Sequence, residues 1–141
     1  MSRSVNDDLD DLRKCAAKAF GLARTVRDQL IGTVVPTLPP ARRTFAEWLG
    51  RKLENGAFFE ESMVRDIDAF IAEIERLFAA GTHIGWEADA HHVRGGYPVV
   101  YLDDRARALE PVVDDLRLLR TAIVRVLDTA RAASIAGSLA D

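Results

Sequence analysis

The chain has 141 residues, of which 48% are hydrophobic and 29% are charged, a composition that fits one globular domain over 1–141 and excludes disordered and fibrous proteins. Its net charge of −3 argues against a protein that mainly binds the nucleic-acid backbone, because such domains usually carry a basic face. The single cysteine excludes an internal disulfide. The sequence shows neither a secretory signal pattern nor an apolar run of membrane-spanning length, so we expect a cytoplasmic protein that enters no membrane.

The N-terminal part of the chain has the spacing of a long amphipathic helix. Its apolar residues follow one another at alternating steps of three and four, which places them on one stripe of an α-helix and matches a heptad seam. The stripe consists of Leu9, Leu12, Ala16, Ala19, Ala23, Val26 and Leu30. Four aspartates between positions 7 and 11 favour a helix start, because carboxylates stabilise the positive end of the helix dipole. We expect the helix to end within 32–35, because Pro36 cannot continue it.

Two further helices are predicted in the middle of the chain. The first runs from Pro39 to Glu54, because proline suits a first helical turn and the Asn-Gly pair at 55–56 is typical of a helix end. The second runs from about Phe58 to Ala80, where an apolar face recurs with helical period. Its exposed side is acidic, whereas the preceding helix is basic, so the two helices are expected to lie antiparallel beside each other.

A fourth helix is predicted to start at Pro111, and we expect residues 103–109 to form a separate short turn of helix, angled by the proline. Its apolar stripe consists of Val112, Leu116, Leu119, Ile123, Val126, Ala130 and Ala133. Because the core positions of all four helices are apolar, a di-iron carboxylate centre inside a bundle is excluded. The predicted fold is all-α: an antiparallel four-helix bundle with a long irregular or β-hairpin-like loop between the third and fourth helices.

That loop, residues 81–102, differs in composition from the helices. It holds all three histidines, both tyrosines and one of the two tryptophans. The segments THIGW and YPVVYL are rich in β-type residues, and Gly95 and Gly96 permit a sharp turn, so we expect a hairpin or flap folded over one end of the bundle. Trp86 and Tyr97 should then be substantially buried against the bundle.

The loop is also the candidate binding site. The residues expected to contact a partner are Trp86, His91, His92, Arg94, Tyr97 and Tyr101. The aromatic rings would supply the apolar part of a recognition surface, and the histidines with the arginine would supply its polar rim. We expect no catalytic residue, no bound metal and no cofactor in this interpretation.

A small enzyme or ligand-binding protein is the alternative. Glu87 and His91 would share a face if WEADAHH formed a turn of helix, and His83 would complete a three-ligand site for zinc or iron. The histidines would otherwise serve as acid/base groups. The pair Arg76 and His83 resembles the Arg-x4-6-His motif of the HEPN helical-bundle ribonucleases, which implies an acid/base and phosphate-binding unit.

The resemblance stops at that pair. Leu77 stands where the motif usually has a polar residue, and Gly81 breaks the helix between the arginine and the histidine. We therefore assign the chain to no family. A nuclease-like or metal-dependent activity stays the second hypothesis.

The function expected from the sequence is that of a non-enzymatic interaction module, or of a small subunit in a multi-protein assembly. The predicted first and fourth helices are longer than the 39–54 helix can cover, which leaves part of their seams for another chain. A partner protein or a homodimer is therefore expected. Nucleic acid is not expected as a partner, and a small molecule stays open.

Overall fold

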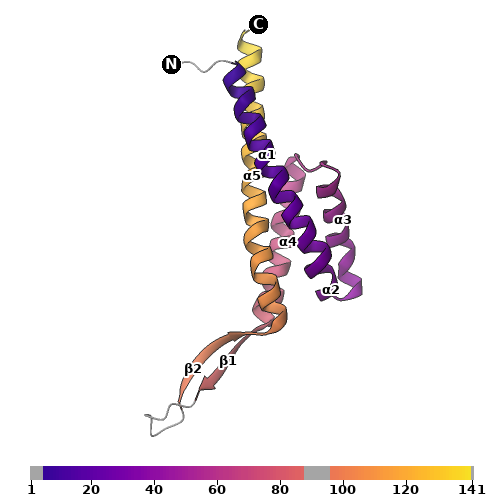
Figure 1. Ribbon diagram of the computed structural model, residues 1–141, viewed down its shortest axis with the longest axis vertical. Coiled ribbons are helices and arrows are strands. Elements are labelled where there is room, and N and C mark those ends of the chain that lie inside the picture. The colour runs from indigo at the N-terminus through magenta and orange to yellow at the C-terminus, as the bar shows by residue number, and fades with distance from the viewer. Residues whose placement is uncertain (1–4, 88–95, 141) are drawn as a thin grey trace.

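The computed structural model describes residues 5–87 and 96–140, most of which lie in four long helices (Figure 1). These are α1 (Val5–Gln29), α3 (Arg43–Glu54), α4 (Glu61–Ala80) and α5 (Asp104–Ala140). Two strands, β1 (Thr82–Glu87) and β2 (Tyr97–Leu102), form a small antiparallel sheet. The predicted helical class is confirmed in this coarse form, and the loop predicted between the third and fourth helices contains a hairpin.

The first helix continues beyond its predicted end. A π-helical turn, Leu30–Val34, follows α1 directly and leads into the single turn α2 (Val35–Thr37). Pro36 lies in the first turn of α2, where its missing N–H is tolerated, so the wider turn before it lets the helical path continue. The path ends at Leu38, which adopts an extended conformation with ψ 147° because the residue before a proline avoids the helical region.

The next two helices start slightly later than predicted. A short 3-10 turn, Pro40–Arg42, precedes α3, and α3 ends at Glu54 as expected. Helix α4 begins at Glu61 rather than near Phe58. Phe58 is instead a fully buried connector residue whose ring lies 5.4 Å from Phe20 and 4.5 Å from Phe59, centroid to centroid. Phe58 therefore contributes its ring to the core from the connector between α3 and α4.

Pro111 does not start a helix, which corrects the prediction for 103–109. Helix α5 runs through it for 37 residues. A proline removes the hydrogen bond to the carbonyl four residues earlier, here that of Arg107. Both residues are exposed, so water can hydrate that carbonyl. On the other side of the helix, Leu109 and Val112 are buried on either side of the proline, and their packing holds the helix together.

The core lies between the four long helices. Helix α5 packs against both α1 and α4, and α3 packs against α1. The largest fully buried side chains of the core are Phe58, Phe70, Leu30, Leu38, Leu49, Met63, Ile67, Ile74, Leu109, Leu116, Leu119 and Ile123. Within the described ranges, no polar or charged residue is buried. None of the helices in these ranges has both the length and the apolarity needed to cross a membrane.

The hairpin does not fold over the helices. Figure 1 shows β1 and β2 extending away from the ends of α4 and α5 as an arm. The expected burial of Tyr97 is therefore wrong, because its side chain is 43% exposed. Trp86 belongs to β1, but its side chain lies outside the described part of the chain.

Candidate functional site

The arm is held by a tight junction between the end of α4, β1 and the start of α5. The N–H of Gly81 donates to the carbonyl of Leu77 at 3.1 Å, and the carbonyl of Gly81 accepts from the N–H of Asp103 at 2.8 Å. A Cβ on Gly81 would lie 2.5 Å from Asp103 Oδ1 and 2.8 Å from the Cβ of Ala106. Only glycine fits such a close approach, so this residue sets where the arm leaves the helices.

Asp103 connects the arm to α5 through its side chain. Its Oδ1 accepts from the backbone N–H of Ala106 at 2.9 Å, which is the contact of an N-terminal helix cap. Its Oδ2 lies 3.3 Å from Nε2 of His83 on β1. One carboxylate therefore joins the first strand to the fifth helix.

The same contacts act on the charge of that carboxylate. The N–H of Ala106, followed by the hydrogen bond and the charge of His83, lowers the pKa of Asp103, while partial desolvation opposes this change. The charged form of Asp103 is thus the form that the junction favours. The imidazole of His83 also stacks on the ring of Tyr101, with centroids 5.4 Å apart and an interplanar angle of 30°.

The strand register sorts the arm into two faces. His83 pairs with Tyr101 and Gly85 with Val99, and a Cβ on Gly85 would lie 3.0 Å from the ring of Tyr101. The aromatic side chains lie on this face and pack against other residues of the same face. On the opposite face Ile84 pairs with Val100.

Ile84 and Val100 are the most exposed large apolar side chains described, at 73% and 71%. Direct cross-strand partners lie next to each other on one face of a sheet, so these two side chains form one apolar patch in solvent. We call this pair the arm patch. Alternation along β1 and β2 groups Ile84 with Val100 on one face but does not indicate that this face is exposed, and the sequence prediction assigned the apolar part of the site to the aromatic residues instead.

The residues predicted to bind a partner are only partly brought together. Tyr97 and Tyr101 lie on the aromatic face of β2, 43% and 50% exposed. Trp86 pairs with Pro98 in the register, and its side chain is not among those described. His91, His92 and Arg94, predicted as the polar rim, lie outside the described residues.

The predicted metal site is not tested for the same reason. Its members His91 and the side chain of Glu87 fall outside the described part, while His83 contacts Asp103. Among the described residues, no group of three or more His, Cys, Asp or Glu is arranged to hold a metal ion. Arg76, the other member of the ribonuclease-like pair, lies exposed on α4.

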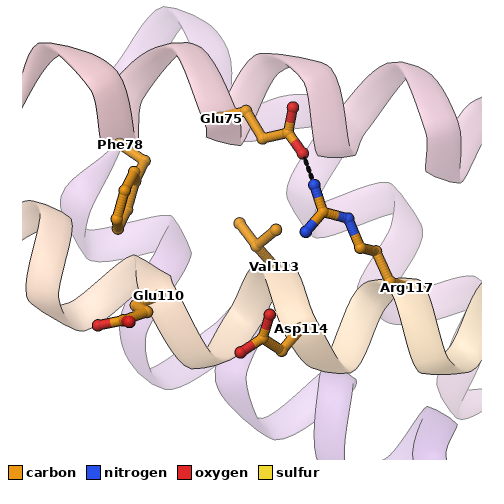
Figure 2. A pocket seen from close by; sticks show the side chains of 6 residues that line it. All are labelled: Glu75, Phe78, Glu110, Val113, Asp114 and Arg117. Carbon is orange, nitrogen blue, oxygen red and sulfur yellow. Dashed lines mark hydrogen bonds and ion pairs between the residues drawn. The ribbon is translucent and has the colours of Figure 1, made fainter.

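A separate pocket of about 380 Å³ lies between α4 and α5. Its lining residues are Glu75, Phe78, Glu110, Val113, Asp114 and Arg117 (Figure 2). Arg117 donates to Glu75 across the two helices, and Glu110 and Asp114 stand one turn apart on α5 beside the apolar wall. The lining holds no serine, threonine, cysteine, histidine or lysine, and its ionisable groups are three carboxylates and the guanidinium of Arg117.

The described surface therefore has three distinctive features: the arm patch, the aromatic face and the Gly81–Asp103 junction. They place apolar and aromatic groups in solvent and hold them at a defined position relative to the helices. Comparison of the chain with protein-family models, with curated proteins and with solved structures returns no match.

Proposed function

We propose that this chain is a non-enzymatic protein-interaction module, or a small subunit of a multi-protein assembly, whose β1–β2 arm docks a partner protein. The observation that carries the proposal is the arm patch, in which Ile84 and Val100 are 73% and 71% exposed side by side. Burying an aliphatic side chain of this size contributes about 1.5–3 kcal/mol. The fully buried centre of an interface is more apolar than the rest of a protein surface, so an exposed apolar pair suits such a centre.

The state of the arm also favours a partner. A two-stranded hairpin alone in water is marginally stable, and among the described residues β1 and β2 form a sheet of two strands, so each has an outer edge. A partner that covers the arm patch or adds a strand to an edge would remove both costs. The histidines, Arg94 and Trp86 of the 81–102 segment, together with Tyr97 and Tyr101, are proposed to surround this contact.

The helices serve as the rigid base for the arm, and we infer that they form an antiparallel four-helix bundle. Ion pairs between α4 and α5 support this: Arg131 meets Glu61 at 2.6 Å and Arg120 meets Asp68 at 2.6 Å, so one numbering rises as the other falls. Glu54 of α3 contacts Arg27 of α1, and Arg42, the last residue of the 3-10 turn before α3, contacts Glu73 of α4. The compartment that we propose is the cytoplasm.

Two isosteric substitutions on one strand test the role of the arm. Val100→Thr removes apolar surface from the arm patch, and Val99→Thr makes the same chemical change on the aromatic face one residue away. Threonine retains the β-branched shape, so both variants should keep the hairpin. The tagged chain is used to retain proteins from a lysate of its own cells, and the dissociation constant is then measured with the purified partner.

We expect Val100→Thr, alone or combined with Ile84→Thr, to weaken partner binding by about tenfold or more, because an apolar contact is replaced by a hydroxyl that must be desolvated. Val99→Thr should weaken binding much less than Val100→Thr does, because Val99 lies on the opposite face, between the two tyrosines at the rim of the contact. Equal binding by all variants, or equal loss from Val99→Thr, would refute the assignment to this face.

A small enzyme or ligand-binding protein is the second candidate, favoured by the contact between His83 and Asp103 at 3.3 Å. A histidine oriented by a carboxylate is the arrangement that acid/base catalysis uses. This candidate predicts a turnover that His83→Gln abolishes while partner binding at the arm patch persists. The interaction proposal predicts no such activity in the wild type.

A further inference from the structure

We propose that two copies of this chain pair around a two-fold axis through the N-terminal half of α1, with the acidic first turns of one copy in a basic groove of the other. The surface lies on the helices and not on the arm. The inference therefore does not depend on the proposed function of the hairpin.

The groove lies between α1 and α5 and has a volume of about 490 Å³. Its lining residues are Lys14, Cys15, Lys18, Leu22, Leu118, Thr121, Ala122 and Arg125. Three of these are cations and none is a carboxylate, while the apolar side chain of Leu118 is 53% exposed. The groove therefore suits an acidic segment, because such a segment brings opposite charge to the lysines and the arginine that line it.

The complementary charges lie on the same helix. Asp7, Asp11, Lys14 and Lys18 follow at steps of four, three and four. On an α-helix these positions fall within roughly 60° of one another and span about 16 Å along the axis. One stripe of α1 is therefore acidic in its first half and basic in its second.

A stripe with this order is complementary to itself when reversed. If two α1 helices cross antiparallel between Asp11 and Lys14, Asp11 of each copy meets Lys14 of the other, and Asp7 meets Lys18. A two-fold axis repeats each contact, so every facing pair is attractive. Arg125 on α5 is a further cation in the lining of the groove.

The arrangement of the helices leaves the N-terminal half of α1 accessible, while the α5 residues of the groove lie along the stretch where Arg120 pairs with Asp68 of α4. Helix α4 begins at Glu61, whose partner Arg131 lies well before the end of α5, and α3 ends at Glu54 beside Arg27. Figure 1 shows the N-terminal half of α1 and the C-terminal part of α5 projecting together beyond α3 and α4. Two such projecting pairs, packed side by side, would give each pair the neighbours that a four-helix arrangement supplies.

Paired charge reversals test the two halves of the stripe separately. Lys14→Glu with Lys18→Glu makes the stripe wholly acidic, and Asp7→Lys with Asp11→Lys makes it wholly basic. Sedimentation equilibrium of the full chain at micromolar concentration measures the association, with far-ultraviolet circular dichroism to verify folding. The matched control is Arg24→Glu with Arg51→Glu, which has the same charge change as the first variant at exposed positions off the stripe.

We expect a wild-type dimer that weakens with added salt, and we expect each stripe variant to associate about a hundredfold more weakly, because attractive pairs become repulsive. The control should remain dimeric. An equimolar mixture of the acidic and basic variants should form a heterodimer, since all facing pairs are again opposite in charge.

A monomeric wild type, stripe variants that remain dimeric, or a mixture that stays monomeric would overturn the proposal. Binding of an acidic amphipathic peptide to a monomeric wild type would assign the groove to a different protein, and it would equally overturn pairing between copies. Should one variant fail to fold, the salt dependence of the wild-type dimer still decides. A dimer that high salt leaves intact would contradict an interface made of these charges.

Discussion

Replacing Gly81 with alanine tests how the arm is joined to the helices. The new Cβ would lie 2.5 Å from Asp103 Oδ1 and 2.8 Å from the Cβ of Ala106, both well inside van der Waals contact. Ala106 is fully buried, so it cannot yield without moving α5. The φ of Gly81 is −93°, which alanine adopts freely, so the expected cost is steric. Overpacking of this kind destabilises by about 1–3 kcal/mol.

Urea unfolding followed by far-ultraviolet circular dichroism measures this change as a lower midpoint with an unchanged slope. Gly21 and Gly50 provide matched controls, because a Cβ at either position meets no heavy atom within 4 Å. Both lie inside helices, where alanine is favoured over glycine by about 0.5–1 kcal/mol, so these variants should be more stable than the wild type. A Gly81→Ala protein as stable as the wild type, beside stabilised controls, would refute the close approach at the junction.

Three other substitutions have expected outcomes of different sign. The pKa of Asp103 is lowered in the folded state, so its charged form stabilises the fold above its ordinary pKa, and that contribution is lost as the pH falls through the folded value. Urea titrations below about pH 4 should therefore show that the free energy of unfolding of Asp103→Asn falls less steeply with pH than that of the wild type. Phe58→Ala removes a fully buried ring and should lower the free energy of unfolding by about 3–5 kcal/mol in the same assay, and a loss below about 1 kcal/mol would contradict its burial. Pro111→Ala restores a hydrogen bond to Arg107 inside α5 and should raise the melting temperature, whereas a lower one would mean that the proline supports the helix.

The sequence alone was enough to identify the four helical regions, because their stripes are local and periodic. The apolar steps from Leu9 to Leu30 and from Val112 onwards identify faces that are largely buried in α1 and α5. The end of α3 at Glu54 was predicted from the Asn-Gly pair that follows it. Such features depend only on backbone geometry within a few residues, so they can be read without knowing the neighbours in space.

Prolines were interpreted too strictly. The sequence predicts breaks at Pro36 and Pro111, yet helical structure continues through both. The cost of a proline is one hydrogen bond and a steric clash, and burial of Leu109 and Val112 on the other side of α5 outweighs it. That balance is set by tertiary packing, which the local rule does not include.

The structure of the 81–102 segment was likewise predicted only in part from the sequence. Its β-type residues predict paired strands, and the structure pairs Thr82–Glu87 with Tyr97–Leu102. Whether a hairpin folds onto a bundle or extends from it depends on how its two ends are held. Here Gly81, at the start of the segment, contacts Asp103 and Ala106, which follow its end. Both faces of the hairpin carry apolar or aromatic residues, so alternation indicates no inward side, and only the tertiary structure placed Ile84 and Val100 in solvent.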